Sequence, residues 1–198
     1  MPASTAVSCT SCWIRRGAYR VWRVVSNREP VVRPCRYRLC WLNLLYAPLL
    51  TLVASHNSLL YQFAVHDAVS GECLQPGRIA LAPASHHLLV KPDGSFALSD
   101  AARVQSLRPA ADVLFASVAP ICTTRVIAVV LTGWDSDGSN GIQIIKHWGG
   151  IVIAQDETSS EVFQMPRSAI ATGDVDAVLS LEQIAPALVA QVVTRLHV

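Results

Sequence analysis

The side chains best placed for chemistry are two aspartates, Asp135 and Asp137, in one short turn. The turn follows an apolar, β-branched run at residues 126–131. It precedes a helical pattern that leads to a second apolar run at residues 151–154. This order predicts two parallel buried strands joined by a helix. Ligands and catalytic groups collect in loops at the carboxyl ends of such strands, so we expect a functional site at this turn.

A carboxylate in such a turn also has other uses. Aspartate caps helices, because its oxygens accept the free N–H groups of a first helical turn. A calcium loop counted from Asp135 would need glycine and glutamate where Asn140 and Lys146 stand. A phosphate loop is excluded because its lysine is absent and the carboxylates would repel phosphate. Capping and acid–base chemistry therefore both remain open for Asp137.

The elements that must position this turn form an alternating pattern. From about residue 49 onward, strands alternate with helices, which predicts the α/β class with a mainly parallel sheet. Residues 49–54 are expected to form a strand and residues 58–63 a short helix. Pro92-Asp93-Gly94 has the chemistry of a tight turn and predicts a small β-hairpin between residues 88 and 98.

Three further patterns predict helices. Arg108-Pro109 is expected to open one, with the proline in its first turn. Met165-Pro166 starts another that stops at Gly173, and Ser180-x-x-Gln183 is a capping box for a C-terminal helix. A stripe of apolar residues on the helix after the acidic turn predicts core packing; its members are Ile142, Ile145 and Trp148.

Charge divides the 198-residue chain into two unlike parts. Residues 1–50 hold eight arginines and one acid, a net charge of +7, whereas the remainder carries −5. We therefore divide the chain into a basic, Cys-, Trp- and Arg-rich region at residues 1–48, whose order is doubtful, and a domain at residues 49–198. Three explanations of the basic region stay open. It is an arm for nucleic acid or membrane, a zinc site formed by two cysteine pairs, or a stretch translated out of frame.

Other classes of site and location are not favoured. Residues 39–65 lack charge, but polar residues and Pro48 interrupt them, so we expect no membrane insertion. No secretory signal is evident, and unpaired thiols suit a reducing compartment, so we expect a cytoplasmic protein. The histidines that could bind a metal lie on separate predicted elements, without paired spacing, which favours no metal and no cofactor; they are His56, His66, His86 and His87.

Four blocks together resemble the catalytic domain of the chemotaxis protein-glutamate methylesterases. They are LQPGRIALAPASHHLLV, RPAADVLFASVA, LTGWDSDGSNG and AQDETSSEVFQMPRSAIATGDVDAVLSLEQIAPAL, in the order that the family has them. The resemblance extends over residues 58–188. It implies a doubly wound α/β domain with helices on both faces of the sheet. It also implies a bacterial serine hydrolase that removes methyl groups from glutamyl esters on chemoreceptor helices in chemotactic signal transduction.

The resemblance assigns the members of a Ser-His-Asp triad. The family pattern Leu-Thr-Gly-Met-Gly-x-Asp-Gly places the triad acid at Asp137. The family's histidine follows its second strand, which places the base at His56, and the Gly-Ala-Ser-x-Gly-Gly turn of the nucleophile is matched only by Ser4. His87 matches a different family position, and a receiver domain is expected to be missing.

The chain departs from the family pattern at two places. Trp134 and Asp135 replace the family's methionine and glycine beside the triad acid, and Ala6-Val7 replace the glycines after Ser4. Glycines in that turn let backbone donors approach the oxyanion. The sequence therefore leaves open whether the chain is an active methylesterase or a catalytically inactive homologue that binds receptors. Nucleic-acid binding through the Arg-rich arm is a third alternative.

Overall fold

The structure is a computed structural model that describes residues 20–27, 37–44, 64–75 and 78–196, with side chains from residues 66–75 and 78–191. The strands are β1 (Arg20–Asn27), β2 (Tyr37–Leu44), β3 (Ala64–Asp67), β4 (Arg78–Leu81), β5 (His87–Val90), β6 (Phe96–Ser99), β7 (Ile127–Val130), β8 (Ile151–Gln155) and β9 (Ala177–Leu179). The helices are α2 (Ala111–Cys122), the 3-10 turn η2 (Thr123–Arg125), α3 (Ser139–His147), α4 (Gln164–Ala171) and α5 (Leu181–Leu196).

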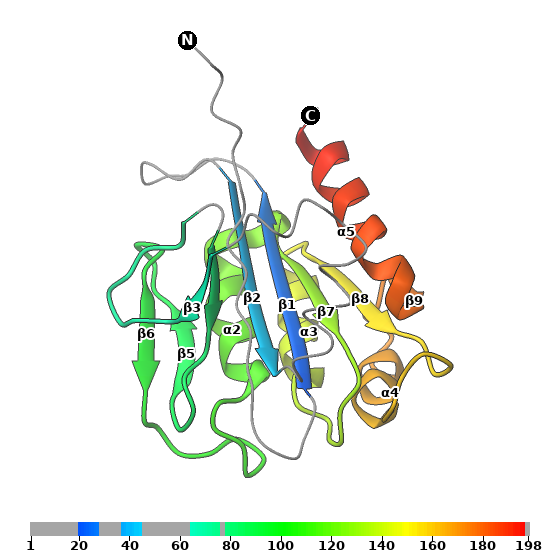
Figure 1. The fold of residues 1–198 in the computed structure, drawn as a ribbon, viewed down its shortest axis with the longest axis horizontal. Coiled ribbons are helices and arrows are strands. Elements are labelled where there is room, and N and C mark those ends of the chain that lie inside the picture. The colour runs from blue at the N-terminus through cyan, green and yellow to red at the C-terminus, as the bar shows by residue number, and fades with distance from the viewer. Residues whose placement is uncertain (1–19, 28–36, 45–63, 76–77, 197–198) are drawn as a thin grey trace.

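A five-stranded sheet in the order β2-β1-β7-β8-β9 forms the centre of the molecule (Figure 1). Strands β7, β8 and β9 are parallel, as predicted for the strands around the acidic turn. Strand β1 is antiparallel to both β2 and β7, so the predicted mainly parallel pairing does not extend to this side of the sheet. The link between β1 and β2, residues 28–36, is shorter than a parallel crossover needs.

Helices cover both faces of the sheet, which confirms the predicted α/β class. Side chains alternate along β7, so that Ala128 and Val130 face one core and Ile127 and Val129 face the other. Helices α2, α3 and α4 pack on the first core, and Figure 1 shows α2 and α3 behind the sheet. Helix α5 closes the second core. All four residues of β7 are buried, as a strand covered on both faces requires.

The predicted strand–helix–strand unit is formed by β7, α3 and β8, and two glycines shape it. Gly149 follows the last turn of α3 with a φ of 78°, a left-handed conformation that favours glycine. Gly141 lies where α3 crosses α2, and a Cβ there would meet Phe115 Cβ at 2.6 Å. The two helices therefore approach closely because this position has no side chain.

The small β-hairpin is also confirmed. Strands β5 and β6 pair antiparallel, and Asp93 at the turn accepts hydrogen bonds from the Ser95 backbone N–H and hydroxyl. These bonds lower the pKa of the Asp93 carboxyl below its ordinary value. Strand β3 pairs in parallel with β4 as a separate two-stranded sheet. The capping box is present as well, since Gln183 Oε1 accepts the Ser180 N–H at the start of α5.

Two helix predictions need correction. Pro109 does not lie in the first turn of α2, because the helix begins at Ala111 with Ala110 as its N-cap. Trp148 is not a core residue: Ile142 and Ile145 are fully buried, but Trp148 is 41% exposed. It follows the last helical residue of α3, where the chain leaves the helical periodicity, and its ring packs edge-on against His147.

Strands β1 and β2 come from the basic region 1–48. The other residues of that region lie outside the described residues. The predicted strand at residues 49–54 and helix at residues 58–63 also lie outside them. The division of the chain at residue 48 stays a prediction. Among the described residues, no helix combines the length and apolar character needed to cross a bilayer.

Candidate active site

The acidic turn lies at the carboxyl end of β7, between this central strand and α3. Its chemically most distinctive side chain is Asp137, which is only 2% exposed although it is a carboxylate. An ionised carboxylate loses hydration on burial and needs donors in compensation. The donors of Asp137 therefore determine what this residue can do.

The donors come from the first turn of a different helix. Asp137 Oδ2 accepts the Ala111 N–H at 2.8 Å, and its Oδ1 accepts the Asp112 N–H at 3.1 Å. Both N–H groups belong to the start of α2, where the helix leaves its N–H groups unpaired. Asp137 thus caps a helix, but the helix is α2 and not α3, whose own N-cap is Gly138. These donors and the helix dipole favour the ionised carboxylate.

The preceding N–H of the same helix end is bound by His87. A backbone N–H only donates, so the Ala110 N–H at 3.1 Å from His87 Nδ1 assigns the ring proton to Nε2. Nε2 in turn donates to the Ala102 carbonyl at 3.1 Å. His87 is 1% exposed and uses both ring nitrogens, so it fixes the start of α2 and is not available as a base.

The other carboxylate of the turn has a local role. Asp135 Oδ1 accepts the Asp137 N–H at 2.9 Å, which is a turn held by its own aspartate. Ser136 Oγ donates to Gln105 Oε1 at 2.9 Å. The turn is therefore stabilised by the Asp135 side chain and by the bond from Ser136 to the segment before α2. Asp135 orients Asp137 by accepting its backbone N–H.

The ends of the neighbouring strands are joined to the turn. Gln155, at the end of β8, is 1% exposed, and its Oε1 accepts the Thr132 N–H at 2.9 Å. Thr132 Oγ1 accepts the Val162 N–H, and Gly133 exchanges backbone bonds with Val162 and Met165. The loop after β8 and the turn after β7 thus form one connected edge of the sheet.

The same edge exposes one large aromatic side chain. Trp134, which follows Gly133 in the turn, is 59% exposed. Met165, 0% exposed, fills the space beside Gly133, the residue before Trp134. A large exposed aromatic side chain of this kind can contact a binding partner.

A serine-rich loop completes this edge after β8. Asp156 Oδ1 accepts the Ser159 N–H at 2.9 Å and the Ser159 hydroxyl at 2.6 Å. These bonds from Ser159 lower the pKa of the Asp156 carboxyl below its ordinary value of 3.8. The loop is therefore held most firmly while Asp156 is ionised.

The structure describes one of the three predicted triad residues. Asp137 occupies a buried position at the carboxyl end of β7, whereas Ser4 and His56 lie outside the described residues. Three residues of this neighbourhood had no assigned role in the sequence analysis: Gln155, Asp112 and, through its bond to Ala110, His87. The sequence offered one signal for Asp112, its place in the first turn of a predicted helix. A carboxylate is common there, and the pattern does not show that this one is buried.

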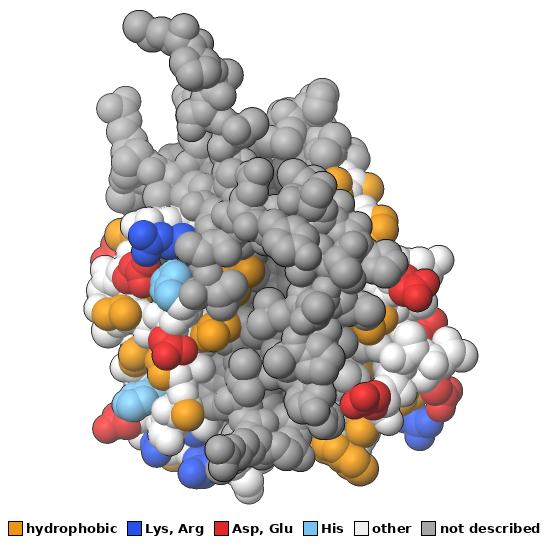
Figure 2. All heavy atoms as spheres, in the orientation of Figure 1, with side chains coloured by type: hydrophobic (Ala, Val, Ile, Leu, Met, Phe, Trp, Pro, Cys, Tyr) orange, Lys and Arg blue, Asp and Glu red, His pale blue; other side chains and the backbone are white. Residues whose placement is uncertain are grey.

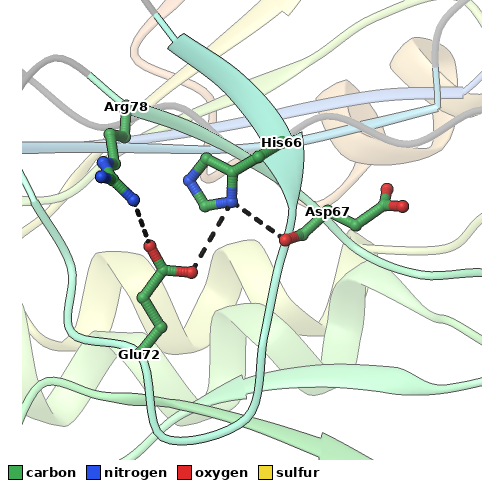
Figure 3. Close-up of polar contacts among 4 residues, drawn as sticks. All are labelled: His66, Asp67, Glu72 and Arg78. Atoms are coloured by element: carbon green, nitrogen blue, oxygen red, sulfur yellow. Dashed lines mark hydrogen bonds and ion pairs between the residues drawn. The ribbon is translucent and has the colours of Figure 1, made fainter.

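A second polar cluster connects β3, β4 and the turn between them (Figure 3). Glu72 Oε1 accepts a bond from Arg78 at 2.8 Å, and its Oε2 lies 3.6 Å from His66 Nδ1, which also contacts the Asp67 carbonyl. Within the described residues no three His, Cys, Asp or Glu side chains come together as metal ligands. The Arg78–Glu72 ion pair ties the turn to β4, and the same Glu72 carboxylate lies against His66 of β3.

Charge on the described surface is mixed. Residues 66–191 hold thirteen acidic and seven basic residues. On the face drawn in Figure 2, acidic and basic side chains are interspersed at its edges. Nucleic-acid binding relies on basic side chains gathered against phosphates. The described domain surface does not have that character.

The fold and the site together define an α/β domain whose candidate site lies at the carboxyl ends of parallel strands. A buried aspartate that accepts two backbone hydrogen bonds follows the central strand, β7. The sequence matches the CheB methylesterase family over residues 51–188. The chain belongs to this family, and the resemblance seen in the sequence is confirmed.

Individual relatives agree with this assignment. A protein-glutamate methylesterase/protein-glutamine glutaminase from Rhodopseudomonas palustris (strain HaA2) is 44% identical over 142 residues, which cover 70% of this chain and 37% of that protein. One of the same name from Moorella thermoacetica is 44% identical over 132 residues, 65% of this chain and 31% of that protein. This chain thus spans about a third of the length of either relative, and 65% of a 40% identical relative from Leptospira interrogans.

A solved structure is similar over nearly the whole chain. The crystal structure of the Thermotoga maritima CheB methylesterase catalytic domain matches with a TM-score of 0.66 and 26% identity. The match covers 96% of this chain and all of that one. These comparisons give no support to the alternative functions, nucleic-acid binding and a catalytically inactive receptor-binding homologue.

Proposed function

We propose that this domain hydrolyses glutamyl methyl esters on bacterial chemoreceptors and acts as a chemotaxis methylesterase in the cytoplasm. The observation that carries the proposal is Asp137. It stands at the triad-acid position of the family motif, at the carboxyl end of the central strand, 2% exposed and bound by two backbone N–H groups. A triad acid needs these properties, because it must stay ionised and keep one orientation while its partner imidazole gains a proton.

We assign the other two roles to residues outside the described part of the chain. His56 acts as the base, and Ser4 as the nucleophile. Ser4 Oγ attacks the ester carbonyl while His56 takes its proton, and the protonated imidazole then donates that proton to the departing methoxide, which leaves as methanol. Water, activated by the same histidine, hydrolyses the glutamyl–serine ester and restores both the carboxylate and the enzyme. Asp137 stabilises the imidazolium in both halves of the reaction.

The same acyl chemistry accommodates a glutamine side chain. The relatives carry both activities in their names, protein-glutamate methylesterase and protein-glutamine glutaminase. With glutamine as the acyl donor, the protonated His56 would donate its proton to the departing amide nitrogen, which leaves as ammonia in place of methanol, and the second half of the reaction would be unchanged. We therefore extend the proposal to deamidation of receptor glutamines, with Trp134 as a contact for the receptor helix.

Covalent labelling tests the residue assignments. A fluorophosphonate probe reacts with a serine only when a base activates it, and peptide mass spectrometry then identifies the labelled serine. We expect label on Ser4 in the native chain, and its loss in His56→Ala and Asp137→Ala. Asp135→Asn is the matched control and should keep the label. Label on another serine would reject Ser4 as the nucleophile, and labelling that is indifferent to Asp137 would reject the triad. Receptor pull-down without labelling or turnover would instead favour the inactive receptor-binding alternative.

A further inference from the structure

A second aspartate, Asp112, lies at the interface between α2 and α3 beside the proposed triad acid. It belongs to the first turn of α2 and is 8% exposed. Its Oδ1 accepts the Gly141 N–H at 2.8 Å, and its Oδ2 accepts the Asn140 side-chain amide at 3.1 Å. Both donors belong to the first turn of α3. Asp112 thus binds the first turn of α3 through one backbone N–H and one side-chain amide, whereas Asp137 binds the first turn of α2 through two backbone N–H groups.

The two helices therefore hold each other by exchanged carboxylates. Asp137, which precedes α3, accepts the N–H groups at positions 111 and 112 of α2, and the side chain of Asp112 returns to α3. Each carboxylate meets the positive end of the opposite helix, where N–H groups lack partners. Two nearby buried carboxylates repel each other, and these four donors offset part of that cost.

Close packing also fixes the position of α3 relative to α2. Gly141, which donates to Asp112, is also the position where a Cβ would meet Phe115 at 2.6 Å, one helical turn from Asp112. The distance between the two helix starts is thus fixed by backbone contact as well as by hydrogen bonds. A displacement of Asp112 moves the N–H groups that orient Asp137, because the same residue supplies one of them.

We propose that Asp112 is a positioning residue for the reaction: by holding the start of α3, it keeps the Asp137 carboxylate at the orientation that its imidazole partner needs. Its effect on turnover rests on the proposed function, whereas its effect on the geometry of Asp137 does not. Displacement of a catalytic group by about 1 Å lowers the rate by as much as about 100-fold. The effect falls on kcat, because the receptor-binding surface is unchanged.

Asp112→Asn removes the charge of the acceptor without changing the size of the side chain. Its carbonyl oxygen still accepts the Gly141 N–H, but its NH₂ group meets the Asn140 NH₂ group, so the second bond survives only if the Asn140 amide turns over, and the charge-assisted character of both bonds is lost in either case. Adding Asn140→Asp reverses the pair, so that the new amide at 112 donates to the new carboxylate at 140. The double variant should restore the bond, and with it the position of Asp137.

A matched control exists at the opposite end of α3. Asp176 also bridges this helix to a backbone N–H, with Lys146 Nζ at 2.6 Å and the Val152 N–H at 2.8 Å, at the amino end of β8. Asp176 is more exposed than Asp112, so Asp176→Asn controls for the loss of a carboxylate contact of α3 far along the helix from Asp137. Any effect that only reflects a weaker α3 should appear in both variants.

Two measurements on the full chain test the proposal. The first is hydrogen exchange of the Ala111 amide, which donates to Asp137, with the β7 amides as the reference for global unfolding. The intrinsic exchange rate of this amide does not depend on the side chain at position 112. We expect exchange at least about tenfold faster in Asp112→Asn, restoration in the double variant and no change in Asp176→Asn. The second is methanol release, in which kcat should fall about 10- to 100-fold with KM within about twofold, and recover in the double variant.

The outcomes separate this proposal from the proposed function. If Ala111 exchange in Asp112→Asn equals that of the native chain, Asp112 does not position Asp137, whatever the turnover. If exchange responds as expected but the native chain releases no methanol, the geometry stands and the methylesterase proposal fails. If kcat falls equally in Asp112→Asn and Asp176→Asn, Asp112 stabilises the fold only, and the positioning role is rejected.

Discussion

Replacement of Asp137 by asparagine tests whether this carboxylate stabilises the fold by binding the start of α2. The asparagine carbonyl can accept one of the two α2 N–H groups, but its NH₂ group would face the other. One hydrogen bond to a charged acceptor is lost, at about 1.5–3 kcal/mol, and a buried N–H is left unsatisfied. The interaction of the charge with the α2 dipole adds about 0.3–1 kcal/mol. We therefore expect Asp137→Asn to lower the free energy of unfolding by about 2–4 kcal/mol.

Urea unfolding followed by circular dichroism measures this change. The control is Asp135→Asn, the same chemical change two residues away. Asparagine holds such turns as well as aspartate does, so its loss should stay below about 1 kcal/mol. The reasoning is refuted if Asp137→Asn unfolds within about 0.5 kcal/mol of the native chain, or if both variants lose the same free energy.

Three further predictions follow from the same contacts. Gly141→Ala should lower the thermal midpoint, because overpacking against Phe115 at 2.6 Å costs about 1–3 kcal/mol and exceeds the gain of about 1 kcal/mol in helix propensity; a raised midpoint in calorimetry would contradict the close helix contact. Trp134→Ala should leave the free energy of unfolding within about 0.5 kcal/mol, since the indole is 59% exposed, but raise KM for a receptor substrate in methanol-release kinetics; an unchanged KM would argue against substrate contact. The pKa of Asp156 is lowered in the fold, so its stabilisation is complete above the ordinary value of 3.8 and is lost as the pH falls through the lower folded value. Asp156→Asn should therefore flatten the decline in urea midpoint below about pH 4, and an unaltered decline would reject this.

Local patterns predicted the elements around the site well. The apolar runs on either side of the acidic turn became β7 and β8, and the turn chemistry at Pro92-Asp93-Gly94 became the β5–β6 hairpin. These features depend on side-chain period and backbone preference, which are present in the sequence itself. The position of Asp137 at the end of β7 followed from them, and from the family motif.

Long-range contacts were not predictable in the same way. The sequence predicted that Asp137 either caps a helix or belongs to a triad, and the cap it forms is on α2, whose first residues lie 25 or more positions away. The short strand β9 was missed because three residues carry no reliable period. Trp148 was placed in the core because a helical stripe does not show where the helix ends. In each case the outcome depended on tertiary packing, which a local sequence pattern does not contain.

Methanol release from a methylated chemoreceptor tests the central claim most directly. Equal concentrations of the native chain, Asp137→Asn and Asp135→Asn would be incubated with receptor carrying labelled methyl groups, at a temperature where all three are folded. We predict turnover by the native chain, little change in Asp135→Asn and a fall of about 10⁴-fold in kcat in Asp137→Asn. The absence of turnover in the native chain, or turnover that persists in Asp137→Asn, would contradict the account.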